Sequence, residues 1–343
     1  MKSIIRLAER AALPDWVIRW GIRRLDGMRL RSERRGDDPE RQQAAKNRLI
    51  DTLRRSPVAI ETDKANEQHY EVPAAFFEHV LGCRMKYSSC YWPPGVKRLD
   101  SAEEAMLALT ADRADVADGM AVLDLGCGWG AFSLWAAEKY PNSNILAVSN
   151  SRLQREFIQQ VCRERGISNL EVLTCDMNRF DTERRFDRIV SVEMFEHMRN
   201  WENLLAKTAG WLNREGRLFI HIFTHRTFAY PFEIEGESNW LGRYFFTGGI
   251  MPSDDLPLYF QDHLALDHHW TLNGRHYQRT ADAWLDNMDA NPAAILAVFE
   301  PQYGDDATLW YQRWRIFFMA CAELWGFRKG REWLVSHYRF RKR

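Results

Sequence analysis

From about residue 100 onward, short apolar runs alternate with stretches whose apolar positions recur at helical spacing. Apolar runs of this length predict β-strands, and the stretches between them predict α-helices. Strands that alternate with helices are typical of an α/β fold with a parallel, doubly wound sheet, whose ligands bind at the carboxyl ends of the strands. The expected strands are 121–125, 144–149, 170–174, 186–192 and 216–223, and the expected helices are 130–139, 151–165 and 201–213.

The segments on either side of this pattern differ from it. Segment 224–262 is rich in glycine, proline and aromatic residues, which predicts an inserted lid. We therefore expect a helical N-terminal cap over 1–100 and a main domain over 101–343. The elements expected to complete this domain are helices at 278–299 and 305–326 and a strand at 332–340.

Residues 1 to about 60 predict amphipathic helices with an excess of basic residues. Their apolar side includes Ile4, Leu7, Trp16 and Trp20, and arginines outnumber the nearby acids. We favour a cap whose basic face is solvated; the alternative is a patch that approaches anionic lipid headgroups. Charged residues, glycine and proline at 34–39 predict a break in this helical segment.

The composition narrows the class of protein. With 343 residues, 45% hydrophobic and 27% charged, the chain is typical of a globular protein with a full core. A formal net charge of zero gives no electrostatic reason to expect a nucleic-acid partner. The six cysteines lack C-x-x-C spacing, so we expect a reducing, cytoplasmic location and no metal. We find neither a signal-peptide pattern nor an apolar run of about 18 residues that would span a bilayer.

Glycines at every second position follow the first expected strand. Gly126, Gly128 and Gly130 follow Asp124, with Leu125 between, and precede a helical segment. A strand, a glycine turn and a helix N-terminus make a site where a ligand can contact bare backbone. The pattern G-x-G-x-G, with an aspartate two residues before it, is the first motif of S-adenosylmethionine-dependent methyltransferases, whereas a dinucleotide-binding loop reads G-x-G-x-x-G. Taken alone, the loop could also be an ordinary tight turn.

Further motifs lie at 65–71, 85–92, 193–198, 224–230 and 244–249. Together with the glycine loop they resemble the cyclopropane-fatty-acyl-phospholipid synthase superfamily, and within it the coclaurine N-methyltransferase branch. The resemblance runs from about residue 65 to the C-terminus. It implies a class I, Rossmann-like methyltransferase fold with a seven-stranded, mostly parallel sheet, and S-adenosylmethionine as the cofactor.

The resemblance also implies which residues bind the cofactor. An acid after the second strand usually holds the ribose, but this chain offers hydroxyl and amide groups at Ser149, Asn150 and Gln154, which also pair with hydroxyls. Asp176 resembles the acceptor for the adenine amino group, with Met177 against the adenine; a helix cap and a core methionine are the alternatives. The other expected cofactor residues are Tyr70, Tyr87, Ser88, Asp124, Gly126, Gly128, Gly130 and Val192.

Three candidate catalytic residues follow the fourth expected strand. An alkyl amine is mostly protonated at neutral pH, so its methylation requires a group that binds the ammonium and one that takes its proton. Glu193, Glu196 and His197 offer two carboxylates and a histidine within a single helical turn. We expect the two glutamates to hold the amine and the histidine to accept the proton; a helix cap with a structural His–Glu pair is the alternative.

The cyclopropane synthases differ from this chain in the same region. The resemblance implies that they hold bicarbonate at positions that match Glu196, His221 and Tyr277 here. Their cysteine falls on Ser89, and the glycine before their Met-Phe-Glu-His falls on Glu193. A carboxylate at this position repels an anion and attracts a cation, which favours amine methylation over ring formation. Tyr244 and Phe245, in the lid, are further candidates for the wall of the substrate pocket.

These observations give three hypotheses about function. The leading hypothesis is an S-adenosylmethionine-dependent N-methyltransferase of a small, aromatic amine. The second is an enzyme that transfers a methyl or methylene group to unsaturated phospholipid acyl chains, with peripheral membrane contact. The third is a non-catalytic protein that binds S-adenosylmethionine. Either a monomer or a homodimer is compatible with the sequence.

Overall fold

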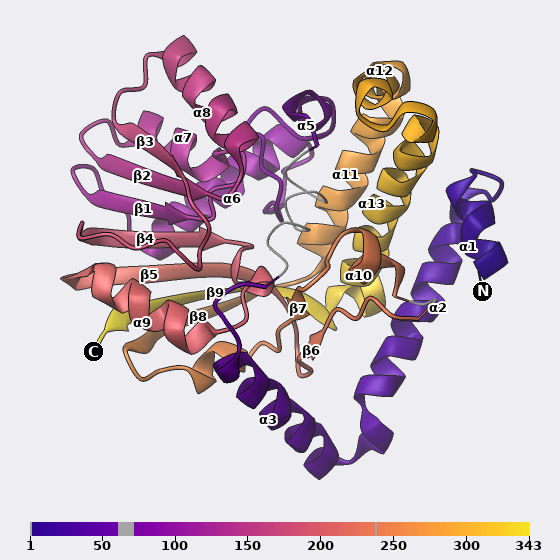
Figure 1. Cartoon of the computed structure of the whole chain (residues 1–343), viewed down its shortest axis with the longest axis horizontal. Helices are drawn as coiled ribbons and strands as arrows, with labels where there is room; N and C mark the ends of the chain where they lie inside the picture. The colour runs from indigo at the N-terminus through magenta and orange to yellow at the C-terminus, as the bar shows by residue number, and fades with distance from the viewer. Residues whose placement is uncertain (1, 61–71, 237–238) are drawn as a thin grey trace.

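A seven-stranded sheet forms one half of the molecule (Figure 1). The computed structural model describes residues 2–60, 72–236 and 239–343. The strand order is β3-β2-β1-β4-β5-β9-β8; the first five strands are parallel, and β9 runs antiparallel to both β5 and β8. The predicted α/β fold with a mostly parallel sheet is confirmed. The strands are β1 (Ala121–Leu125), β2 (Asn144–Ser149), β3 (Leu170–Thr174), β4 (Phe186–Val192), β5 (Leu212–His225), β8 (Leu264–Leu272) and β9 (Trp333–Lys342).

Helices cover both faces of the sheet. The side chains of each strand alternate between the two faces, so an apolar strand has side chains to bury on both. Along β1, Val122 packs in a cluster with Leu107 of α6 and Phe132 of α7. Leu123, one residue later, packs in the opposite cluster with residues of α3 and α9, which includes Trp201. These helices are α3 (Pro39–Arg55), α6 (Leu99–Ala114), α7 (Ala131–Lys139) and α9 (Trp201–Trp211), and α8 (Arg152–Arg165) packs beside β2 and β3.

A second, helical body lies beside the sheet (Figure 1). It buries the large rings of Trp284, Trp314 and Phe317 in one cluster with residues of α2 and α5. Arg19 of α2 forms ion pairs with Asp282 and Glu323, which attach this helix to α11 and α13. The helices are α1 (Lys2–Glu9), α2 (Asp15–Glu33), α5 (Ala74–Val80), α11 (Arg275–Ala290), α12 (Pro292–Tyr303) and α13 (Ala307–Gly330).

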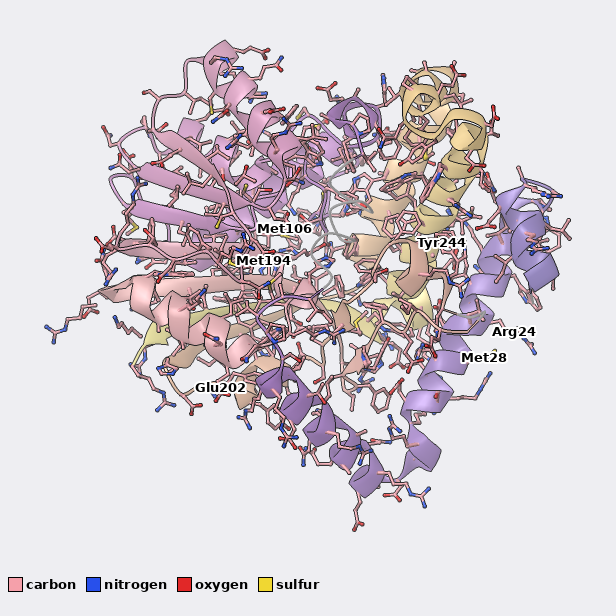
Figure 2. The ribbon with its side chains drawn as sticks, viewed as in Figure 1. Arg24, Met28, Met106, Met194, Glu202 and Tyr244 are labelled. Carbon is pink, nitrogen blue, oxygen red and sulfur yellow. The ribbon has the colours of Figure 1, made fainter. Side chains whose placement is uncertain are left out.

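Several short elements lie between the longer helices and strands. Met106 of α6 and Met194, just after β4, lie toward the middle of the molecule (Figure 2), and both are buried. Within the described helices, none combines the length and apolar character that crossing a bilayer requires. The short elements are η1 (Arg35–Asp37), η3 (Phe195–His197), β6 (Tyr230–Pro231), α10 (Trp240–Tyr244), β7 (Ile250–Met251), η4 (Leu256–Tyr259) and η5 (Gly304–Asp306).

The expected elements are found, with two corrections. The helix expected at 278–299 is two helices, because Pro292 cannot continue a helix and Asn291 before it leaves the helical conformation. Strand β8 was not expected. It lies at the sheet edge, and Asp267, His268 and His269 interrupt its apolar pattern, so its sequence is similar to that of a loop.

We expect Gly274→Ala to destabilise the protein. A Cβ at Gly274, where α11 begins, would lie 2.2 Å from the Trp333 carbonyl oxygen and 2.4 Å from that of Trp325. Relief of this overlap requires backbone movement, so the free energy of unfolding should fall by about 1–3 kcal/mol in denaturant titrations. Gly210→Ala in α9 is the matched control, because its Cβ meets no atom within 4 Å and should be neutral or stabilising. Equal stability of the two variants would contradict this account of the junction.

Candidate functional site

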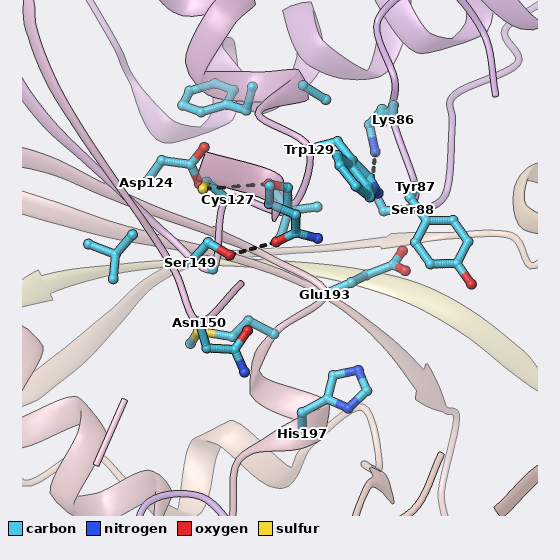
Figure 3. Close-up of a pocket in the computed structure, with 18 of the residues that line it drawn as sticks. Lys86, Tyr87, Ser88, Asp124, Cys127, Trp129, Ser149, Asn150, Glu193 and His197 are labelled. Carbon is cyan, nitrogen blue, oxygen red and sulfur yellow. Dashed lines mark hydrogen bonds between the residues drawn. The ribbon is translucent and has the colours of Figure 1, made fainter. Parts of the chain in front are cut away.

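A large cavity opens at the carboxyl ends of β1, β2 and β4 (Figure 3). It encloses about 1510 Å³ of space, including its open mouth. The cavity lies where the strand order reverses between β1 and β4, the usual position of a ligand in a sheet of this topology. Its wall also includes Trp284 of α11 and Phe317 of α13, so both bodies of the molecule contribute to it.

The three glycines after β1 have positive φ angles and differ in their surroundings. A Cβ on Gly126 (φ 84°) would lie 2.8 Å from Met194, and one on Gly130 (φ 80°) would lie 2.7 Å from Ile158. These two glycines are therefore required by the packing of the protein. A Cβ on Gly128 (φ 54°) would meet no described atom within 4 Å, and Gly128 lines the cavity. Its backbone is thus available for close contact with a ligand.

Asp124 lies in the cavity wall and is almost fully buried. Ser133, in the first turn of α7, donates a hydrogen bond from Oγ to Asp124 Oδ2 at 2.5 Å. Burial raises the pKa of Asp124 to about 7, because the charged form loses solvation; the bond from Ser133 opposes this shift. A cationic group of a ligand near Asp124 would favour its ionised form.

The end of β2 presents hydrogen-bonding groups to the cavity. Ser149 Oγ donates to Gln154 Oε1 at 2.6 Å, and this bond fixes the orientation of the Gln154 amide. The Gln154 Nε2 and Trp129 Nε1 donors are buried and have no partner among the described residues, although both residues line the cavity. Unpartnered buried donors are rare in folded proteins, so they indicate a ligand that supplies acceptor oxygens or ring nitrogens.

Glu193 is the most constrained residue of the site. Its φ angle is 49°, in the left-handed region that a residue with a side chain seldom adopts. Its carboxylate accepts hydrogen bonds from the Ser89 N–H at 2.8 Å, from Tyr277 Oη at 2.7 Å and from His221 Nε2 at 3.2 Å. Three separate segments of the chain therefore hold one carboxylate, whose side chain is 9% exposed.

Lys86 is the cation that lies near Glu193. Burial raises the pKa of Glu193, and the positive charge of Lys86 opposes this shift. The Lys86 ammonium donates hydrogen bonds to Ser88 Oγ at 2.5 Å and to the Ser89 carbonyl at 2.8 Å (Figure 3). Burial in turn lowers the pKa of Lys86. The positive charge of Lys86 therefore favours the ionised form of Glu193.

His221 and His337 occupy paired positions on β5 and β9, behind Glu193. Arg113 Nη1 lies 2.9 Å from His337 Nδ1, and because arginine can only donate, this ring nitrogen is the acceptor. Burial lowers the pKa of both histidines well below the usual value, and the charge of Arg113 adds to the effect. His221 is therefore neutral and donates its Nε2–H to the Glu193 carboxylate, so it does not cancel the charge of Glu193.

The other two predicted catalytic residues lie in η3, and the structure separates them. His197 lines the cavity, and its ring stacks on Phe246 at 5.8 Å between centroids and 10° between planes. Glu196 is fully buried outside the cavity wall and accepts a hydrogen bond from the Phe223 N–H at 2.7 Å. Burial raises the pKa of Glu196 well above the usual value, and the charge of Glu193 raises it further. This buried carboxyl group, bonded to the backbone of β5, is suited to holding η3 against that strand.

Most of the predicted cofactor residues gather around the cavity. Asp176 is not in the wall, although its neighbours Cys175 and Met177 are. Its Oδ1 accepts a hydrogen bond from the Asn178 N–H at 2.7 Å. Gly130 packs on Ile158 behind the wall, and Tyr70 lies outside the described residues. The predicted cofactor residues in the wall are Tyr87, Ser88, Asp124, Gly126, Gly128, Ser149, Asn150, Gln154, Met177 and Val192.

The predicted substrate residues lie in the cavity wall, just behind it or outside it. Tyr277 lines the cavity, whereas Ser89 and His221 lie just behind the wall and contact Glu193. Phe245 and Tyr244 lie outside the wall. Phe245 stacks on Phe317 with 4.2 Å between ring centroids, and the Arg313 guanidinium lies 4.3 Å from the centre of the Tyr244 ring. Phe246, the next residue along the chain, lies in the cavity wall instead.

Several wall residues were missed by the sequence analysis. Lys86 lies within the motif at 85–92, and Trp129 lies within the glycine loop, so their positions were a usable signal. Trp284 and Phe317 lie on helices that reach the cavity only through long-range packing, and their local sequence does not distinguish them from core residues.

Comparisons with known proteins agree with this geometry. The family model described as "Mycolic acid cyclopropane synthetase" matches residues 59–335. (S)-coclaurine N-methyltransferase of Thalictrum flavum subsp. glaucum is 40% identical over 99% of this chain and 96% of its own length. Cyclopropane-fatty-acyl-phospholipid synthase of Escherichia coli (strain K12) is 28% identical over 78% of this chain and 66% of its own.

Solved structures are similar over most of the chain. A crystal structure of coclaurine N-methyltransferase bound to N-methylheliamine and S-adenosylhomocysteine has a TM-score of 0.95 and 38% identity, and covers 99% of both chains. Mycolic acid cyclopropane synthase CmaA1, complexed with S-adenosylhomocysteine and CTAB, has a TM-score of 0.70 and 26% identity, and covers 82% of this chain and 99% of its own.

The cavity fits the same kind of cofactor. Open space beside Gly128, the buried carboxyl of Asp124 and the unpartnered donor of Gln154 suit an amino acid joined to a nucleoside. The predicted cofactor, S-adenosylmethionine, is confirmed by the neighbours that bind its product, and so is the predicted branch of the superfamily. The chain therefore belongs to the mycolic acid cyclopropane synthetase family of S-adenosylmethionine-dependent methyltransferases, in the branch that includes the coclaurine N-methyltransferases.

Proposed function

We propose that this protein methylates the nitrogen of a small aromatic amine. The observation that carries this proposal is the ionisable carboxylate of Glu193, held by three hydrogen-bond donors beside a cavity with aromatic walls. A protonated amine needs an anion to bind it, and aromatic faces stabilise a cationic amine by about 0.5–2 kcal/mol each. Relatives in this branch include (S)-coclaurine and pavine N-methyltransferases, which supports an amine acceptor.

The ends of β1 and β2 would hold the cofactor. Asp124 and the Gly128 backbone suit its methionine portion, and Ser149 with Gln154 suits the ribose. When bound, S-adenosylmethionine supplies a methyl carbon on a positively charged sulfur; as this carbon bonds to the acceptor nitrogen, its bond to sulfur breaks. The protein must then align the nitrogen and keep its lone pair free.

In this proposal, Glu193 and His197 have separate roles toward the acceptor amine. Glu193 binds the ammonium form of the acceptor, because three donors fix its carboxylate in one place and the charge of Lys86 favours its ionised form. His197, in the cavity wall near the end of β4, takes the proton that the nitrogen must lose before transfer. Glu196 lies outside the wall, so we assign it a positioning role through its bond to Phe223.

Transfer to a lipid alkene is the second candidate, and the site argues against it. Bicarbonate in the synthases is expected among the residues that match Glu196, His221 and Tyr277. In this protein two of them, His221 and Tyr277, donate to the carboxylate of Glu193. A second anion there would be repelled. Incubation with labelled S-adenosylmethionine and separate panels of amines and unsaturated phospholipids tests this choice, and label found only in lipid would reject amine methylation.

We also propose a reducing, cytoplasmic location. All six cysteines are free in the structure, and four of them are buried. Free thiols in this number are typical of proteins that fold in a reducing compartment.

We predict that Glu193→Gly strongly reduces amine methylation and leaves cofactor affinity nearly unchanged. Loss of the carboxylate should lower kcat/KM by about 100-fold or more, because the ammonium loses its counter-charge. Glu193→Ala is the matched variant, and should be less stable than Glu193→Gly by about 1 kcal/mol because of the positive φ angle. Steady-state kinetics, calorimetry with the cofactor and denaturant titration measure the three quantities. Lost cofactor binding in Glu193→Gly would contradict our placement of this residue.

The methylation rate should fall as the pH decreases, and this fall should begin above the pH range in which exposed glutamates usually titrate. Burial raises the pKa of Glu193, so protonation and loss of amine binding begin at a higher pH than in an exposed glutamate. Lys86→Met removes the positive charge that lowers this pKa and should move the acidic limb of kcat/KM to still higher pH. Lys46→Met, which removes an ion pair with Asp255 and a cation–π contact with Tyr259 outside the cavity wall, is the control. The same amine is used in all of these assays. If the acidic limb of kcat/KM does not move in Lys86→Met, the proposed effect of the Lys86 charge on Glu193 is refuted.

Cofactor binding should weaken as the pH falls through about 7. The pKa of Asp124 is raised to about 7 by burial, and the ammonium of the cofactor's methionine portion favours the ionised carboxylate. Calorimetry in buffers of different ionisation enthalpy should detect proton release near this pH. Gly128→Val should raise the Kd at every pH, because its side chain enters the open space beside the loop. Binding without pH dependence would contradict the role of Asp124.

A further inference from the structure

The N-terminal helices carry most of the large apolar side chains that the described chain exposes. Of eight such side chains, five belong to α1 and α2: Ile4, Leu7, Trp16, Trp20 and Met28. Trp16 and Trp20 are 72% and 57% exposed, whereas Trp284, Trp314 and Trp325 are almost completely buried. Single exposed apolar residues are common, but a concentration of them on two consecutive helices indicates an interaction surface.

Helix α2 has two different faces. Arg19 binds Asp282 and Glu323 on the inner face, where Ile18 and Leu30 are also buried. Trp16, Trp20, Arg24 and Met28 follow one another at intervals of four residues and form a single outward stripe. Figure 2 shows Arg24 and Met28 on the side of α2 that faces away from the rest of the molecule.

The outward face is cationic as well as apolar. Within the described residues, Arg24 and Arg31 of α2 form no ion pair, and the Arg24 guanidinium lies 6.0 Å from the centre of the Trp20 ring. The acids of α2 do not balance these charges. Asp26 and Glu33 are buried, and Asp15 is paired with Arg315 of α13.

We propose that the outward face of α1 and α2 docks on the surface of a bilayer that contains anionic lipids. Trp side chains prefer the level of the headgroups, and arginine is attracted to anionic headgroups. Arg24 stands between Trp20 and Met28 in the same row, so the surface that covers this row must accept apolar side chains and a positive charge side by side. A headgroup layer accepts the tryptophans and the arginine together. This inference does not depend on the identity of the methyl acceptor.

Co-sedimentation of the full chain with vesicles tests the proposal. We expect binding to vesicles of phosphatidylcholine mixed with phosphatidylglycerol, and weaker binding to phosphatidylcholine alone and at high salt. Arg24→Gln and Arg31→Gln should each weaken binding about fivefold, and the double variant Trp16→Ser/Trp20→Ser should abolish it. Arg163→Gln on α8 and Leu258→Ser in η4 are the matched controls and should bind like the wild type.

Three results would overturn the proposal. The first is the absence of wild-type binding to either kind of vesicle, and the second is an equal loss of binding in the controls. The third is a wild-type dimer, seen in sedimentation velocity, that Trp16→Ser/Trp20→Ser dissociates, because the face would then join two copies of the chain. Circular dichroism and methylation of a water-soluble amine, both expected to be unchanged, show that the variants remain folded.

Discussion

The carboxylate of Glu193 is the point at which the parts of this structure meet. Ser89 lies in the segment before α6, His221 on β5 and Tyr277 on α11, and each donates a hydrogen bond to this one group. A buried carboxylate is unfavourable unless such donors solvate it, so the packing of sheet against helical body also determines the chemistry of the site. Burial raises the pKa of Glu193, and the positive charge of Lys86 opposes this shift, whereas a neutral His221 donates a hydrogen bond without cancelling the carboxylate charge.

The backbone conformation at position 193 is unusual for a glutamate. A φ angle of 49° suits glycine, the residue that the synthases are expected to have at this position. A glutamate at this position has a strained backbone conformation, and its carboxylate places a negative charge at a fixed point in the cavity. Strain of this kind persists only when the surroundings hold it in place, and here three donors do so. We interpret this exchange of residues as the change from an anion-binding site to a cation-binding site within one family.

The sequence predicted the architecture better than the site. Apolar runs located the central parallel strands closely because these strands are buried on both faces, whereas edge strand β8, with Asp267 and two histidines, gave no such signal. The other edge strand, β3, was predicted from its short run of β-forming residues. Gly128 and Asp124 were predicted to line the cofactor site because the loop pattern depends on local backbone geometry, and both lie in the cavity wall. Spacing alone placed Glu193, Glu196 and His197 together. It could not show that η3 turns His197 toward the cavity and Glu196 away from its wall, since this depends on packing against β5.

The most direct test of the central claim is a crystal structure of the protein with S-adenosylhomocysteine and an amine that it methylates. Our account predicts the amine nitrogen within hydrogen-bonding distance of the Glu193 carboxylate, either directly or through one water molecule. A nitrogen that lies away from Glu193, or a carbonate ion bound beside His221 and Tyr277 with Glu193 displaced, would contradict it.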